Sequence, residues 1–255
     1  MSRHSKANLA ERPTAVNVGV ESVIFSVDIV HGQLLVLLVV SHNDPADQPI
    51  WSLPRTLLYA GESLETAAYR GLSEKIHVSD LYLEQLYTFD DGFFDGTTEP
   101  GGDAADGAVK AALPKGQFLS VSYFALVRIA EAKPIAADSC QIRWCPFDQI
   151  PSLAFNHNRI LSYGYRRLRS KLEYSPVAFD ILPQTFTLGD LYQLYSTVLG
   201  EQFSDYSNFR ARLLKLGFLT DTGHKASRGA GRPASLYRFD PQKFAPLKDK
   251  PLVFV

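Results

Sequence analysis

The sequence predicts an α+β fold of two domains, and three observations support this. Strand-like segments rich in β-branched and aromatic residues dominate residues 1–155, with one clear amphipathic helix among them. Residues 156–255 show helical patterns that end in two short strand-like segments. The sign of the net charge changes at the same place. Residues 1–155 hold 11 Lys and Arg against 19 Asp and Glu, whereas residues 156–255 hold 15 Lys and Arg against 8 Asp and Glu. A basic half of this kind is expected of a domain that meets a polyanion.

Four segments follow from these patterns. They are a disordered tail at 1–14, a strand-rich domain at 15–155, a connecting helix at 156–175 and a helical domain at 176–255. Residues 90–117 are rich in Gly, Asp and Ala, which bury little apolar surface, so a mobile insertion is expected there. The chain start lacks the apolar core of a signal peptide, and no apolar run reaches the length of a membrane span. We therefore expect a cytoplasmic protein without a membrane partner.

The first domain is expected to contain five strands and one helix. The strands are predicted at 16–27, 33–40, 81–89, 118–129 and 142–146. The helix is predicted at 64–76, where Leu64, Ala68, Leu72 and Ile76 recur at helical spacing. The two cysteines, Cys140 and Cys145, are too few for a disulfide framework and lack a second ligand pair for zinc, so we expect them in the core.

Residues 53–78, LPRTLLYAGESLETAAYRGLSEKIHV, follow the spacing of a known motif. Glu62, Arg70, Leu72, Glu74 and Val78 match the Nudix box, G-x5-E-x7-R-E-U-x-E-E-x-G-U, in which U is aliphatic. The departures are Thr56 for the first glycine, Gly71 and Lys75 for two of the three clustered glutamates, and His77 for the last glycine. In an intact box the glutamates bind magnesium, which prefers several oxygen ligands. Because one carboxylate remains beside an ammonium, the resemblance implies no catalytic residue, no metal ligand and no hydrolysis.

The second half predicts three helices and a hairpin. Residues 158–172 place apolar residues on one stripe, with five basic residues around it. Thr187 and Asp190 form a capping arrangement for a helix, LGDLYQLYSTVLG, that ends at Gly200. Ser204 or Asp205 can cap a third helix at 206–216, with Phe209, Leu213 and Leu214 on its core side. Strands at 218–222 and 235–239 would follow.

Two helices joined by a tight turn and followed by a hairpin with a basic tip predict a winged helix-turn-helix domain that binds double-stranded DNA. The third helix would enter the major groove, and the wing would contact phosphates. The candidate DNA-binding residues are Ser207, Asn208, Arg210, Arg212, Lys215, Lys225, Arg228 and Arg232. The alternatives are a basic face that serves only to dock on the acidic domain, and a three-helix accessory domain with a solvated hairpin.

Three further segments, KLEY, NFR and GRPASLYRF, make the resemblance more specific. Together with the degenerate box, they are similar to the Nudix-related transcriptional regulators of bacterial NAD metabolism, over residues 16–239. This resemblance implies a Nudix α/β/α sandwich with a mixed sheet, followed by the winged helix. It also implies a homodimeric repressor without a cofactor, whose effector is ADP-ribose or a related NAD-derived metabolite. The candidate effector-binding residues are Trp51, Arg55, Glu62, Arg70 and Glu74.

Two other functions remain open from the sequence. One is a hydrolase of ADP-ribose or another nucleoside diphosphate derivative, with a metal ligand donated by an acidic residue of the insertion, among Asp90, Asp91, Asp95 and Glu99. The other is a sugar-responsive repressor of the same architecture. His157, before the connecting helix, is expected to mark the helix start or to contact the effector. Trp51 and Tyr59 either stack on an adenine or belong to the core.

Overall fold

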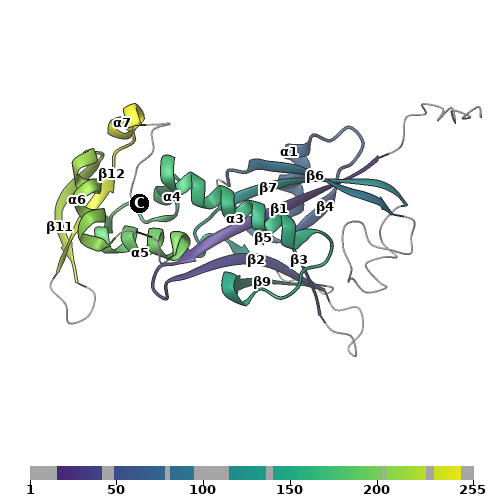
Figure 1. Ribbon diagram of the computed structural model, residues 1–255, viewed down its shortest axis with the longest axis horizontal. Coiled ribbons are helices and arrows are strands. Elements are labelled where there is room, and N and C mark those ends of the chain that lie inside the picture. Colours follow the sequence, from purple (N-terminus) through teal and green to yellow (C-terminus); the bar gives the residue numbers. More distant parts are fainter. Residues whose placement is uncertain are drawn as a thin grey trace, which may run out of the picture.

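The computed structural model describes residues 16–41, 49–77, 81–94, 115–135, 140–200, 203, 205–227 and 233–247. Figure 1 shows a strand-rich body and a smaller, largely helical body, which are joined by the long helix α3 (His157–Tyr174). The α+β fold class is therefore confirmed. None of the helices in these ranges combines the length and the apolar character needed to cross a bilayer.

One mixed sheet organises the first body. Its strands lie in the order β3-β2-β1-β7-β6, with β4 beside β1 and β9 beside β2. Their bounds are β1 Val16–Asp28, β2 Gln33–Ser41, β3 Ile50–Ser52, β4 Arg55–Leu57, β6 Glu84–Phe94, β7 Gly116–Leu126 and β9 Cys140–Pro146. β1 and β7 are parallel, whereas β1 with β2 and β6 with β7 are antiparallel. β3 and β4 were not predicted, because three residues are too few to show alternation.

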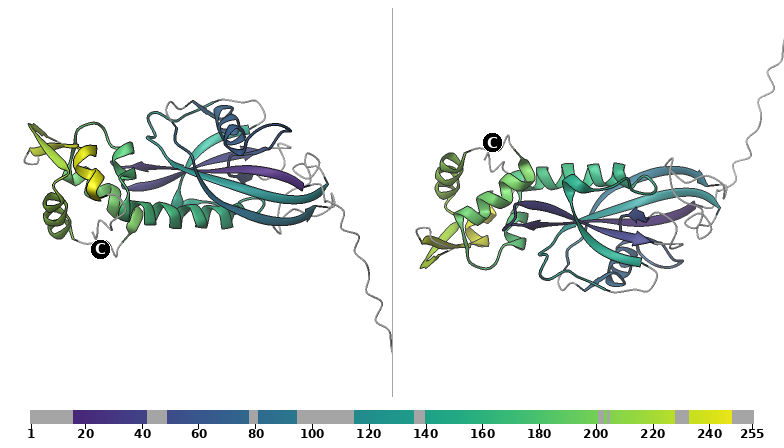
Figure 2. Two further views of the ribbon diagram at one scale, coloured as in Figure 1. Left: turned by 90° about the horizontal axis from the view of Figure 1, so that it is seen from above. Right: turned by 90° about the horizontal axis from the view of Figure 1, so that it is seen from below.

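Helices cover both faces of this sheet. Val20 and Ile24 of β1 are buried on the face that carries α1 (Leu64–Ser73), whereas Val23 and Phe25 are buried on the face that carries α3. The alternation arises because successive side chains of a strand point to opposite faces. Figure 2 shows α1 and α3 on opposite sides of the strands. The predicted Nudix-type sandwich is thereby confirmed.

Several predicted boundaries in this body are wrong, including those of the strands predicted at 81–89 and 118–129, which are β6 at Glu84–Phe94 and β7 at Gly116–Leu126. The helix predicted at 64–76 ends at Ser73, because Ile76 enters a short strand, β5 (Ile76–His77), that pairs with β8 (Lys133–Pro134). The insertion predicted at 90–117 is too wide, since β6 continues to Phe94 and β7 begins at Gly116. The pairing of these two long strands overrides the turn-like composition of their ends. Residues 95–114 and the predicted tail at 1–14 lie outside the described residues.

The second body has the predicted helix-turn-helix and hairpin. Its elements are α4 Val177–Ile181, β10 Phe186–Thr187, α5 Leu188–Leu199, α6 Tyr206–Leu216, β11 Leu219–Ala226, β12 Ala234–Phe239, α7 Pro241–Phe244 and the 3-10 turn Ala245–Leu247. Thr187 and Asp190 form the predicted capping box of α5, and Gly200 ends that helix with a φ of 78°. Asp205 caps α6, whereas Ser204 lies outside the described residues. The strand order β10-β12-β11 completes a small winged sheet.

The two bodies touch at more than one place. Tyr165 of α3 donates its hydroxyl proton to the carbonyl of Val198 in α5 at 2.9 Å. The turn between β1 and β2 also approaches α5, because a Cβ added to Gly32 would lie 2.6 Å from Nε2 of Gln193. Gly32 has a φ of 64°, which favours glycine at this turn. α5 is thus contacted both by α3 and by a strand turn of the sheet.

The close packing of α3 on β1 depends on Gly164. A Cβ at this position would lie 2.9 Å from Cγ1 of Val23. Gly164→Ala is expected to lower the free energy of unfolding by about 1–2 kcal/mol, because overpacking outweighs the gain in helix propensity. Denaturant unfolding measures this change.

Gly189→Ala in α5 is the matched control, since its nearest heavy atom is Oγ1 of Thr187 at an ordinary 3.5 Å. This variant should be neutral or stabilising. Val23→Ala should relieve part of the effect of Gly164→Ala in a double-mutant cycle. Equal effects of the two glycine substitutions would contradict the packing argument.

Candidate effector site and nucleic-acid interface

The loop and helix that match the Nudix box are tied together by Arg70 of α1. Its Nε and Nη2 donate to the two carboxylate oxygens of Glu62 at 2.8 and 2.9 Å. Nη1 donates to Oγ1 of Thr56, and Nη2 also donates to the carbonyl of Leu57, both at 2.8 Å. The Arg70 guanidinium holds the pKa of Glu62 below its usual range. Two of the predicted effector-binding residues, Glu62 and Arg70, therefore bind each other and fix the loop before the helix.

Glu74, the carboxylate that remains of the three clustered glutamates, lies beside two cations. Glu74 follows the last residue of α1, and its side chain is 57% exposed. Arg70 Nη1 lies 3.9 Å and Lys75 Nζ lies 4.0 Å from its oxygens. In the described ranges, no three His, Cys, Asp or Glu residues are grouped so that they could hold a metal ion. A single exposed carboxylate flanked by two cations does not fit a divalent cation.

At Gly71, where the family pattern has a glutamate, the Thr56 side chain leaves no room for a side chain. A Cβ at Gly71 would lie 2.8 Å from Cγ2 and 3.0 Å from Cβ of Thr56. The family pattern has a glycine where this chain has Thr56 and a glutamate where it has Gly71. The Thr56 side chain thus occupies space that any side chain at Gly71 would need.

Trp51, another predicted effector contact, lies in β3 and is half-buried. Its carbonyl accepts the backbone N–H of Ala154 at 2.8 Å, and its ring packs against the core cluster on the α3 side of the sheet. Trp51 and Leu153 also form an isolated parallel β-bridge. These contacts give Trp51 a structural role that joins β3 to the segment before α3.

Arg55 belongs to a buried polar cluster that we define as Glu21, Arg55, Asp91, Ser120 and Asn156. Arg55 Nε lies 3.0 Å from Oε1 of Glu21, whose side chain is fully buried. Ser120 hydrogen-bonds both Glu21 and Asp91, and the Asn156 amide nitrogen donates to Asp91. The cluster thus joins β1, β4, β7 and β6 to the residue that precedes α3.

Burial favours protonation of the two carboxyl groups in this cluster. Burial raises the pKa of Glu21 to about 7, partly offset by the Arg55 guanidinium, and burial also raises the pKa of Asp91. A serine hydroxyl has one proton, so Ser120 can donate to only one of the two carboxyl groups. Both contacts are satisfied when one carboxyl group is protonated and donates to Ser120. Burial favours such a neutral carboxyl group, whereas Arg55 favours the charged form of Glu21.

Several buried atoms around the cluster have unmet hydrogen-bonding capacity. Within the described part of the chain, Oε2 of Glu21, Oδ1 of Asn156 and Nε2 of His157 have no hydrogen-bond partner. His157 accepts the Leu53 N–H through Nδ1 at 2.9 Å, and burial, together with Arg55, lowers the pKa of its imidazole well below the usual value. The ring is therefore neutral, with its proton on Nε2.

The segment before α3 has an unusual backbone. Phe155 has a φ of 59°, which is uncommon outside glycine, and its ring centroid lies 4.5 Å from Cζ of Arg55. Asn156 is the residue before the helix, but its side chain forms no cap hydrogen bond and contacts Asp91 instead. The residues just before α3 therefore combine a strained backbone at Phe155 with a buried hydrogen bond from Asn156.

The sequence predicted a functional role for Arg55 but not for most of the residues that form the buried polar cluster with it. Asp91 was named only as a possible metal ligand, and Glu21, Ser120 and Asn156 were not named at all. The available signal was Glu21 itself, a charged residue within the apolar strand VNVGVESVIFSVD. Buried carboxyl groups are rare, so such a residue marks a special environment.

The predicted DNA-binding helix presents a polar surface. Ser207, Asn208, Arg210, Arg212 and Lys215 of α6 are all exposed. Asp205 accepts the backbone N–H groups of Ser207 and Asn208 at 2.9 and 3.1 Å and also binds the Asn208 amide. The capping carboxylate thus orients the first turn of the helix.

One core assignment on α6 is wrong, and part of the wing is not described. Phe209 and Leu213 are fully buried, but Leu214, predicted on the core side, is 38% exposed. Leu214 extends the outer face of α6, because only one stripe of this short helix packs on α5. In the wing, Lys225 is exposed on β11 beside Ser235 of β12. Arg228 and Arg232 lie outside the described residues.

Comparisons with known proteins match both bodies. The NUDIX domain family matches residues 20–166, and the AraR C-terminal winged HTH domain matches residues 174–255. The ADPR responsive transcriptional repressor NtrR of Acinetobacter baylyi is 30% identical over 229 residues, which cover 88% of this chain and 82% of that protein.

Solved structures agree. NrtR of Shewanella oneidensis in complex with a 27mer DNA has a TM-score of 0.66 and 32% identity, covering 89% of this chain and 95% of that one. A MutT/nudix family protein from Enterococcus faecalis has a TM-score of 0.62 and 22% identity, covering 90% and 87%, which shows a shared fold. The chain therefore belongs to the family of Nudix-domain transcriptional repressors that includes NtrR and NrtR.

Proposed function

We propose that this protein is a cytoplasmic, homodimeric repressor that binds operator DNA through its winged helix and responds to ADP-ribose bound by its Nudix domain. The curated relative is named as ADPR-responsive, and the solved relative was crystallised with DNA. One observation in this chain carries the proposal: a Nudix domain with a closed box is joined to a winged helix with an exposed basic α6 by one continuous helix.

Binding without cleavage is the proposed role of the Nudix domain. Magnesium-dependent hydrolysis needs clustered carboxylates around the metal. Here Glu62 is bonded to Arg70, Glu74 is exposed beside two cations, and Thr56 fills the space beside Gly71. These contacts favour a sensor that needs neither metal nor cofactor over a hydrolase.

The proposed route from effector to DNA begins at the buried polar cluster. Arg55 is the cation of this cluster and can pair with a diphosphate, because guanidinium groups bind such oxygens in a bidentate manner. A diphosphate that draws Arg55 away from Glu21 changes the charge balance between Glu21 and Asp91. Asp91 binds Asn156, which starts α3, so the change reaches the connecting helix. The size of the response is limited by the difference in effector affinity between the two domain arrangements.

The proposed DNA contact is a dimeric one. In helix-turn-helix proteins the second helix of the motif lies in the major groove, and half-site spacing follows the twofold symmetry of the protein. α6 is that helix here, and Arg210, Arg212 and Lys215 give it the charge needed to contact a duplex. Effector binding is proposed to favour an arrangement in which the two copies of α6 no longer match the operator.

Incubation with ADP-ribose and magnesium tests the absence of hydrolysis. We expect no AMP above a protein-free blank, because the metal-binding carboxylates are missing. Gly71→Glu alone should not bind magnesium in calorimetry, since Thr56 blocks its side chain. Thr56→Gly/Gly71→Glu/Lys75→Glu is the variant that restores both space and carboxylates. Formation of AMP by the natural chain at an enzymatic rate supports the hydrolase alternative instead.

Salt dependence and Arg210→Ala test the DNA interface. If each subunit neutralises about four phosphates, the logarithm of operator affinity should fall with the logarithm of salt at a slope of roughly −7 per dimer. Arg210→Ala should weaken binding about tenfold and make the slope shallower by about two units per dimer. Fluorescence anisotropy measures both quantities.

Lys133→Ala is the matched control, because Lys133 is an exposed cation on β8 of the first body. This control should keep the affinity and slope of the natural protein. A slope near zero, or equal losses in both variants, contradicts the proposed interface.

Asp91→Asn tests the route through the buried polar cluster. This variant should bind operator like the natural protein. The change in operator affinity that ADP-ribose causes should be about tenfold smaller in the variant, because the neutral amide that it introduces cannot exchange a proton with Glu21. Asp90→Asn is the control on the same strand, since Asp90 is exposed and accepts a hydrogen bond from Gln117. Operator titrations with and without ADP-ribose measure the response.

A full response to ADP-ribose in Asp91→Asn would exclude this route.

The same titration with free pentoses tests the sugar-responsive alternative. A pentose that changes operator binding where ADP-ribose does not would replace the proposed effector.

A further inference from the structure

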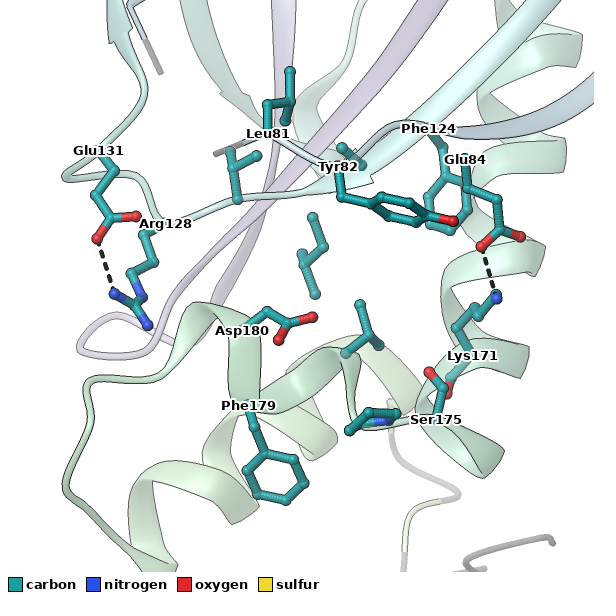
Figure 3. Close-up of a pocket in the computed structure, with 15 residues that line it drawn as sticks. Leu81, Tyr82, Glu84, Phe124, Arg128, Glu131, Lys171, Ser175, Phe179 and Asp180 are labelled. Carbon is teal, nitrogen blue, oxygen red and sulfur yellow. Dashed lines mark hydrogen bonds and ion pairs between the residues drawn. The ribbon is translucent and has the colours of Figure 1, made fainter. Parts of the chain in front are cut away.

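A cavity of about 670 Å³ lies where the two bodies meet. Its walls come from the start of β6, the end of β7 with the turn that follows, the last turn of α3, and α4. Figure 3 shows these four walls around one open space. A volume of this size suits a small organic molecule. The cavity is separate from the buried polar cluster, whose residues do not line it.

The cavity wall mixes apolar surface with charges that are mostly paired. Glu84 is bound by Lys171 at 2.7 Å and by Arg167 at 2.6 Å. Arg128 is bound to Glu131 at 2.8 Å, and its Nη2 also donates to the carbonyl of Leu182 at 2.7 Å. These ion pairs leave little attraction for an added anion. Phe124, Leu126, Val127 and Val177 supply the apolar part of the lining.

Asp180 of α4 is the exception among these charges. Within the described residues, its carboxylate forms neither a hydrogen bond nor an ion pair. The surrounding cavity atoms partly desolvate this carboxyl group and raise its pKa, while the nearby Arg128 lowers it. In Figure 3, Asp180 lies between the Arg128–Glu131 pair on one side and the Lys171–Glu84 pair on the other. The carboxylate is therefore accessible to a cation that enters the cavity.

Tyr82 gives the opposite wall a complementary chemistry. Its side chain is 77% exposed, and Figure 3 shows its ring across the cavity from Asp180. A carboxylate and an aromatic ring that face one space are the two groups that most favour an organic cation. Phe179, by contrast, points away from this space in Figure 3.

We infer that the cavity between the two bodies is a second binding site, which takes a small organic cation with an apolar body. Asp180 would pair with the cationic group, Tyr82 would cover it, and the apolar wall would hold the body of the molecule. Because two walls belong to the sheet and two to α3 and α4, an occupant contacts both bodies at once. Its affinity therefore depends on the domain arrangement, and its binding shifts that arrangement in return.

Three probes with one indole body test this site in the full-length protein: tryptamine is cationic, tryptophol is neutral and indole-3-acetate is anionic. Isothermal titration calorimetry at millimolar concentrations should show saturable binding of tryptamine, weaker binding of tryptophol and none of indole-3-acetate. Asp180→Asn should weaken the binding of tryptamine about fivefold, which is the loss expected for an accessible charge pair, and leave the binding of tryptophol unchanged. Tyr82→Ala should also weaken tryptamine, and its exposed position leaves the fold intact.

Asp148→Asn is the control for charge, since Asp148 is exposed on the 3-10 turn Phe147–Gln149 and does not line the cavity. This variant should bind tryptamine like the natural protein. The inference is overturned if tryptamine does not bind, if indole-3-acetate binds as tightly, or if Asp180→Asn and Asp148→Asn behave alike. None of these outcomes depends on whether ADP-ribose is the effector of the Nudix domain.

Discussion

The packing of α3 against the central sheet ties the strand-rich body to the helical one. Gly164 lets the helix approach Val23 of β1, and Asn156 at its start binds the buried Asp91. The same helix then contacts α5 through Tyr165. One helix therefore borders the Nudix domain at one end and the winged-helix domain at the other. Burial of apolar side chains along α3 stabilises this arrangement, and the polar contacts at its start belong to the route proposed for the effector.

The departures from the Nudix box pattern are accommodated by local packing and hydrogen bonds. A box glutamate has been replaced by Gly71 and a box glycine by Thr56, and the two positions are in direct contact. The pair keeps the local volume filled, as close packing requires, while the carboxylate is lost. Arg70 and Glu62 remain, but their hydrogen bonds fasten the loop to α1. The contacts of Arg70 and Glu62 thus keep the shape of the loop and helix where the clustered glutamates of the family pattern are replaced.

The sequence predicted elements with strong local signals and missed those set by contacts between distant segments. The capping box at Thr187 and the end of α5 at Gly200 were correct because capping chemistry depends on neighbouring residues. β3 and α4 were missed because their few residues are ordered by strand pairing and interdomain packing. The buried polar cluster draws on residues up to 135 positions apart, from Glu21 to Asn156, so its membership could not be read from spacing. Leu214 was misplaced for a related reason, because a short helix with one partner buries a narrow stripe.

The approach of Gly32 to Gln193 limits how the winged helix can reorient. A domain attached only through the end of α3 could swing in any direction about that junction. Here the turn between β1 and β2 also contacts α5, and Arg128 donates to the carbonyl of Leu182 after α4. Contacts at several separate places therefore oppose such a swing. The geometry of the strand turn, far from α6, thereby restricts how the winged helix can move relative to the sheet.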